Sequence, residues 1–354
     1  MIINNIDRDR TTIAWLGLAH GIADAAAGLL IIRLAMSPSI GAGLTILTYQ
    51  LLAFATQPIV GLIIDRHHRA RAGVILSLLA TAVGLLARSI SPSLTILLAG
   101  FGSAAFHVSA GSIVAVTAKK SIVPFGWFTA PGVVGLALGG TLALNIPTDN
   151  YILAALVAIA LVLHLLLPPQ SSLESQPNRP ESSELAIPLA GKESIGLLLL
   201  GAIAVRSLVW NLVDAVHQSD RQILLYLALA AGAGKIAGGI LADRCGWRQW
   251  GTIALLGAAI CLNYGSQRQE LLLLGVALLQ SVTPLALAAT ISLCPGLPAT
   301  GSGLALGLAI AIGGVFFLVC PQPNVPAIYL SAIAVLALVL LYYSIDRHSV
   351  TRRD

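Results

Sequence analysis

Several ionisable side chains lie inside long apolar stretches of this sequence: His20, Asp24, His107, Arg206 and Lys235. Ionisable groups in such stretches are costly unless they pair or line a polar cavity, so they mark sites of function. His20 and Asp24 are four residues apart, which places them on one face of a helix. A carboxylate beside an imidazole can bind and release a proton. We predict proton exchange at this pair, with a packing or hydrogen-bonding role as the alternative.

Arg206 is predicted to lie too deep in its apolar stretch to reach water easily. Its guanidinium suits bidentate binding of an anionic phosphonate or carboxylate, or else a permanent pair with Asp24. His107 lies in a segment of small residues, where a structural or a functional role fits. The stem of Lys235 allows its amine to extend toward the membrane interface. Four amides are expected to complete a substrate site or to hydrogen-bond between helices: Gln50, Gln57, Asn211 and Gln280.

The composition predicts that these side chains are positioned by helices in a lipid bilayer. Of the 354 residues, 57% are hydrophobic and only 10% are charged, with a mean hydropathy of +0.88. So little charge cannot cover a soluble protein of this size. The net charge of +5 is spread in short clusters, which excludes a nucleic-acid-binding face. The four cysteines are widely spaced, so no metal, disulfide or cofactor is expected.

The chain contains twelve apolar segments, each about the length that crosses a bilayer as a helix. Alternation of the kind found in membrane barrels is absent, so we predict an all-α integral membrane fold. The predicted spans are 11–35, 41–64, 72–90, 93–117, 124–145, 150–167, 194–217, 222–242, 250–265, 269–293, 299–320 and 326–344.

Orientation and domain division follow from the loops. With a cytoplasmic N-terminus, fourteen of the twenty Lys and Arg residues fall on the cytoplasmic side and four on the other. This bias predicts that both termini are cytoplasmic. Residues 168–193 are rich in Pro, Ser and Glu, which is typical of a flexible linker. We therefore expect one six-helix bundle over 1–167 and a second over 194–354.

One charged pattern occurs twice, at "GLIIDRHHRAR" (61–71) and "GILADRCGWR" (239–248). The two copies are 178 residues apart, each after the second span of its half. Basic residues alone would anchor a loop at the membrane surface, but an anchor needs neither the glycine nor the aspartate. The aspartates are expected to pair with arginines or to cap a neighbouring helix, and so to lock the halves in one state. The predicted gate comprises Gly61, Asp65, Arg66, Arg69, Gly239, Asp243, Arg244 and Arg248.

These repeats and the two-bundle layout resemble the major facilitator superfamily, whose signature loop reads Gly-xxx-Asp-Arg followed by basic residues. The stretches "AHGIADAAAGLL", "GFGSAAFHVSAGSIVA", "VRSL" and "GSGLALGLAIAIGG" are similar to the fosmidomycin-resistance group of bacterial drug antiporters. This resemblance covers most of the chain. It implies a proton-linked exporter, and it favours a role in proton coupling for His107 beside His20 and Asp24.

We therefore expect a multi-pass secondary transporter of the bacterial inner membrane, active as a monomer and not as an enzyme. It would export a small anionic or zwitterionic organic molecule or drug by alternating access, in exchange for protons. An importer or uniporter of a small metabolite is the runner-up. A membrane receptor or subunit that transports nothing is less favoured, because such a protein has little reason to keep charges at mid-membrane.

Overall fold

The computed structural model describes residues 5–36, 42–88, 90–145, 149–166, 192–217, 220–314 and 326–344, and their regular structure is entirely helical. The predicted linker 168–193 lies outside these residues except for its last two positions, which begin a helix.

Within the described residues, helices overlap each of the twelve predicted spans, and residues 315–320 of the eleventh span lie outside the described part. In the first half they are α1 (Asn5–Ala35), α2 (Ala42–Gln50), η1 (Leu51–Ala55), α3 (Gln57–His67), α4 (Ala70–Ala87), α5 (Pro92–Ala118), α6 (Val123–Asn145) and α7 (Asp149–Leu166). In the second half they are α9 (Lys192–Val216), α10 (Arg221–Cys245), α11 (Trp247–Tyr264), α12 (Gln269–Ser281), α13 (Thr283–Ser292), α14 (Pro298–Gly303), η3 (Leu304–Leu308), α15 (Ala309–Gly314) and α17 (Ala327–Ser344).

Nine helices among the described residues are long and apolar enough to cross a membrane. Two further apolar helices, Tyr151–Leu165 and Pro298–Gly314, are shorter. The predicted total of twelve membrane spans and the cytoplasmic position of both termini stay predictions.

Local sequence signals explain several helix ends. Ser91 precedes α5 in an extended conformation, and its hydroxyl accepts a hydrogen bond from the Leu94 amide. Asp220 caps α10 in the same way. At the C-terminal end of α3, His68 adopts the left-handed conformation that ends many helices. Capping chemistry therefore accounts for these three helix ends.

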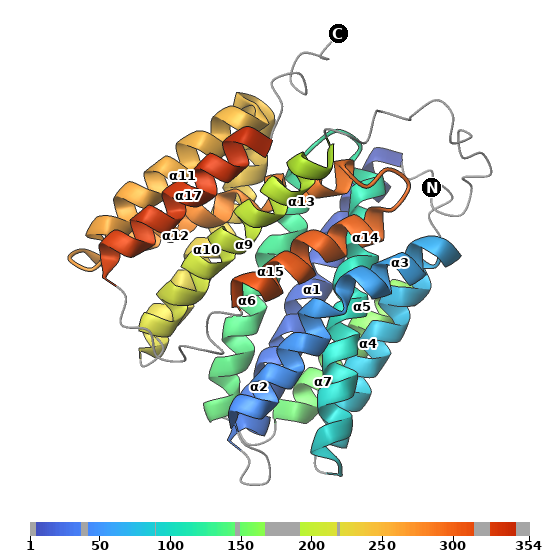
Figure 1. Cartoon of the computed structure of the whole chain (residues 1–354). Coiled ribbons are helices and arrows are strands. Elements are labelled where there is room, and N and C mark those ends of the chain that lie inside the picture. Colours follow the sequence, from blue (N-terminus) through green and yellow to red (C-terminus); the bar gives the residue numbers. More distant parts are fainter. Residues whose placement is uncertain are drawn as a thin grey trace.

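The two halves of the chain form two adjacent groups of helices, joined most closely where α6 packs on α10 and α3 packs on α14 (Figure 1). Glycines permit this approach, since a Cβ added at Gly61 would lie 2.5 Å from the Ala299 carbonyl oxygen, and one added at Gly126 would lie 2.7 Å from that of Lys235. The π-helical turns η1 and η3 also touch, one from each half. Such turns often lie at functional sites.

Candidate functional site

A cluster of three polar side chains lies inside the first half, where α1 packs against α5 and α6. His20 and Asp24 come from α1, and His107 comes from α5. The two histidine Nε2 atoms are 3.0 Å apart, and His20 Nε2 is 3.2 Å from an Asp24 oxygen. The second Asp24 oxygen is 3.8 Å from His107 Nε2. The three residues predicted for proton coupling thus share one site.

Backbone carbonyls fix which ring nitrogens of the histidines carry hydrogen. His20 Nδ1 is 2.8 Å from the Phe128 oxygen, and His107 Nδ1 is 2.8 Å from the Ser103 oxygen. A carbonyl only accepts, so each Nδ1 must donate its N–H. In neutral rings both Nε2 atoms are then lone-pair acceptors, and they face each other beside a carboxylate. A cation satisfies this arrangement: one proton shared between the rings would make a hydrogen bond and an imidazolium beside the Asp24 carboxylate.

Neighbouring residues close the cluster on most sides. Both histidine side chains are buried, whereas the Asp24 side chain keeps 15% of its surface exposed. Gly132 of α6 leaves room for the imidazole, because an added Cβ would fall on His20 Nε2. Tyr49 is buried, hydrogen-bonded to the Ser103 side chain, and within electrostatic range of Asp24. The open edge of the site is therefore its carboxylate.

Lys235 of α10 connects this cluster to the second half of the chain. Its Nζ donates a hydrogen bond to the Thr129 carbonyl of α6 at 3.2 Å. It interacts electrostatically with Asp24 and His107 on one side and with Arg206 on the other. The sequence placed Lys235 near the interface and outside the predicted site. Lys235 approaches Asp24 because α10 packs on α6, and no local sequence signal specifies that contact.

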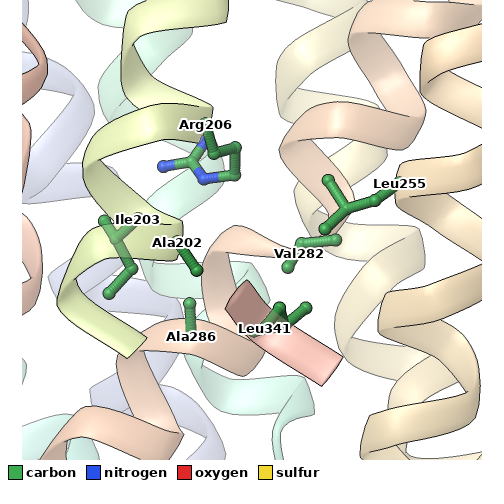
Figure 2. A pocket seen from close by; sticks show the side chains of 7 residues that line it. All are labelled: Ala202, Ile203, Arg206, Leu255, Val282, Ala286 and Leu341. Atoms are coloured by element: carbon green, nitrogen blue, oxygen red, sulfur yellow. The ribbon is translucent and has the colours of Figure 1, made fainter. Parts of the chain in front are cut away.

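Arg206 of α9 is buried, with 5% of its surface exposed, and it lines a small pocket (Figure 2). Its Nη1 donates to Gln280 Oε1 at 3.0 Å, and the Thr283 hydroxyl donates to the same oxygen. Its Nε is buried and has no hydrogen-bond partner among the described residues. The other side chains that line the pocket are apolar: Ala202, Ile203, Leu255, Val282, Ala286 and Leu341.

The remaining predicted amides lie elsewhere along the contact between the halves. Gln50 and Asn211 both approach Gly314, at 4.0 and 3.9 Å from an added Cβ. Gln57 is fully buried, and its amide donates to the Ala53 carbonyl of the preceding turn η1 at 2.8 Å. Only Gln280 of the four is therefore in contact with Arg206. The alternative of a permanent Arg206–Asp24 pair differs from this structure, where each has other partners.

The first copy of the repeated motif caps a helix of the opposite half. Asp65 at the end of α3 accepts hydrogen bonds from the amides of Ala299 and Thr300, at 3.0 and 2.7 Å, and from the Thr300 hydroxyl at 2.7 Å. These are the first residues of α14. A carboxylate at a helix N-terminus is favoured by the helix dipole and by its unpaired amides.

The second copy makes the equivalent contact in the reverse direction. Asp243 at the end of α10 accepts from the Ile122 amide at 2.9 Å and from the Ser121 hydroxyl at 2.6 Å, at the start of α6. These contacts show helix capping, which is one of the two roles predicted for the aspartates. Arg66, Arg69 and Arg244 are exposed, and Arg248 stacks on Tyr342 at 3.7 Å.

Comparison with known proteins gives a fold and no closer relative. No family model and no curated protein matches the sequence. The solved structure of FucP, described as a major facilitator superfamily transporter in the outward conformation, matches with a TM-score of 0.72 and 14% identity, over 95% of this chain and 98% of that one. The human organic anion transporter MFSD10 matches with a TM-score of 0.69 and 16% identity, over 96% and 100%. The chain therefore has the fold of the major facilitator superfamily transporters.

Proposed function

We propose that this chain is a secondary transporter that exchanges a small anionic or zwitterionic organic molecule for protons, most simply as an exporter in a bacterial inner membrane. The observation that carries the proposal is the presence in one fold of a buried His–Asp–His cluster and a buried, incompletely satisfied arginine. A scaffold or receptor gains nothing from either group. The fold supports alternating access, and the sequence resemblance to the fosmidomycin-resistance antiporters supports export.

Protons are proposed to bind at the His20–His107 pair. With both Nδ1 atoms committed to carbonyls, the 3.0 Å contact between the Nε2 atoms holds together only while one proton lies between them. Loss of that proton leaves two lone pairs and a carboxylate facing each other, and their repulsion favours rearrangement. Protonation and conformation are coupled in this way.

Substrate is proposed to bind at Arg206, whose buried Nε is a donor with no acceptor among the described residues. An anionic oxygen satisfies this donor and the buried charge together. Lys235 interacts electrostatically with both Arg206 and Asp24. Through Lys235, the binding of an anion at Arg206 can therefore change the electrostatic environment of the proton site. The Asp65 and Asp243 caps are proposed to keep the cytoplasmic end closed in this conformation, which leaves access from the opposite side.

The proposal is tested in everted membrane vesicles that hold a pH gradient. A panel of phosphonates, organic acids and common drugs is added, and the collapse of the gradient is followed with a fluorescent dye. We expect at least one compound to collapse it in wild type and not in vesicles without the protein. If labelled compounds instead accumulate in whole cells together with protons, the runner-up importer replaces the exporter.

Arg206→Gln is expected to raise the half-saturating concentration of that compound roughly 10- to 100-fold, because a hydrogen bond to a charged group contributes about 1.5–3 kcal/mol. The half-saturating concentration of Arg206→Lys is expected to lie between those of wild type and Arg206→Gln, since lysine keeps the positive charge and loses the planar guanidinium. Arg88→Gln, the same change at the end of α4, serves as the control. Equal half-saturation in wild type and Arg206→Gln would remove Arg206 from the substrate site.

A further inference from the structure

We propose that His20, Asp24 and His107 form a binding site for a divalent transition-metal ion of the zinc class. The inference rests on the geometry of the cluster alone and holds whatever the chain transports. It also differs from the sequence-based expectation of no metal, which considered only the spacing of the cysteines.

The first support is the convergence of three ligand atoms. One atom from each residue lies within 4.8 Å of the others, with separations of 3.0 Å between the two Nε2 atoms and 3.2 Å from His20 Nε2 to Asp24. Zinc binds nitrogen and oxygen at about 2.0–2.1 Å, which places tetrahedral ligand atoms about 3.3 Å apart. Imidazole and carboxylate are also the ligand types that suit zinc, cobalt and manganese.

The second support is the way the imidazoles are held. A metal-binding histidine usually donates its other ring N–H to a carbonyl or carboxylate, which fixes the tautomer and aims the free nitrogen at the metal. His20 and His107 both do this, through the carbonyls of Phe128 and Ser103. Neither ring has to turn to bind an ion.

The third support is the glycine at position 132, because only a residue without a Cβ permits His20 and Asp24 to lie as close to α6 as they do. A Cβ at Gly132 would fall on His20 Nε2 and lie 2.8 Å from the Asp24 oxygen. Three protein ligands leave a fourth position for water or another small ligand, as in zinc sites whose ion exchanges. The exposed edge of Asp24 provides entry. Lys235 and Tyr49 face the cluster from α10 and α2, and the positive charge of Lys235 opposes a divalent ion.

The test uses the full-length protein, purified without a histidine tag and titrated with Co²⁺, whose visible absorption reports tetrahedral coordination. We expect one cobalt ion per chain, displaced by Zn²⁺. Asp24→Asn and His107→Gln are each expected to weaken the binding more than about tenfold, because even outer partners of a metal ligand contribute 10- to 100-fold. Lys235→Met is expected to tighten it several-fold.

Gly132→Ala provides the sharpest variant, because it keeps all three ligand residues and displaces His20 and Asp24 from their present positions. It is expected to weaken cobalt binding as much as the loss of a ligand. Gly140→Ala is the matched control on the same helix, since its added Cβ meets only Ile32 at 3.8 Å, an ordinary contact. Thermal unfolding verifies that each variant is folded.

Two outcomes overturn the proposal. One is that wild type binds cobalt no more tightly than folded Asp24→Asn and Gly132→Ala. The other is that binding disappears only when the exposed neighbours His67 and His68 are both replaced by alanine, which would place the metal at the loop after α3.

Discussion

Asp24→Asn is expected to abolish proton-driven transport while substrate exchange at equal pH continues. The carboxylate lies 3.2 Å from His20 Nε2 and is the group that neutralises the imidazolium in the cluster. Asparagine keeps the shape and loses the charge. Removing one partner of a buried ion pair typically costs about 3–5 kcal/mol, which lowers occupancy by the shared proton more than about 100-fold. Without the shared proton, the pH gradient cannot drive transport.

The measurement compares two assays on the same proteoliposomes. Accumulation driven by a pH gradient is expected to fall to background in Asp24→Asn, whereas exchange of labelled for unlabelled substrate is retained. Asp214→Asn makes the same change in α9, on an exposed residue away from the cluster, and is expected to behave as wild type. Accumulation at the wild-type rate in Asp24→Asn would show that coupling lies elsewhere.

Asp65→Asn and Asp243→Asn are each expected to open the end of the molecule that the repeated motif closes. Each carboxylate accepts several hydrogen bonds from the first residues of a helix in the other half. An asparagine keeps one acceptor oxygen and loses the charge that the helix dipole favours. Because a hydrogen bond to a charged group contributes about 1.5–3 kcal/mol, the open state is expected to gain roughly 10- to 100-fold in population. The double variant is expected to gain more.

Cys294 is a native reporter of this opening, since it lies in the turn between α13 and α14. Burial, together with the charge of Asp65, raises the pKa of the Cys294 thiol and so lowers its thiolate fraction at neutral pH. In a background where Cys294 is the sole cysteine, both variants are expected to speed its alkylation by maleimide. Asp65→Asn has a second effect: removal of the negative charge lowers the thiol pKa, so alkylation begins at lower pH. Asp243→Asn leaves that charge in place and reports opening alone.

Asp220→Asn is the control for loss of a helix cap that does not join the two halves. Asp220 caps α10 within its own half, at the opposite end of the helix from Asp243. Its loss is expected to leave Cys294 alkylation unchanged. If maleimide alkylates Cys294 at the wild-type rate in all three variants, Asp65 and Asp243 do not hold closed the end of the molecule at which they lie.

The sequence predicted what short-range patterns can specify. Apolar segments of membrane-spanning length located the helices, and the four-residue spacing of His20 and Asp24 placed them on one face. The repeated motif predicted a contact between the halves but left open whether the aspartates meet arginines or helix ends. That choice depends on where α6 and α14 begin relative to α10 and α3, which is a property of packing.

Contacts between distant segments explain what was missed. His107 is 87 residues from His20 in the chain, and their 3.0 Å contact requires the α1–α5 crossing. Along α10 alone, Lys235 is about two helical turns from the cytoplasmic end of its predicted span at residue 242. Only the packing of α10 on α6 brings it toward Asp24. A permanent Arg206–Asp24 pair was the alternative that the sequence left open, whereas in the structure Gln280 of α12 is the hydrogen-bond partner of Arg206.

Proton release on substrate binding tests the central claim most directly. Purified protein in weakly buffered detergent solution is mixed with the compound identified in vesicles, and released protons are counted with a pH dye. We predict about one proton per chain for wild type, as expected for a single proton shared by two imidazoles, and almost none for His107→Gln. Equal release by both proteins, or none by wild type despite measured binding, would contradict the account.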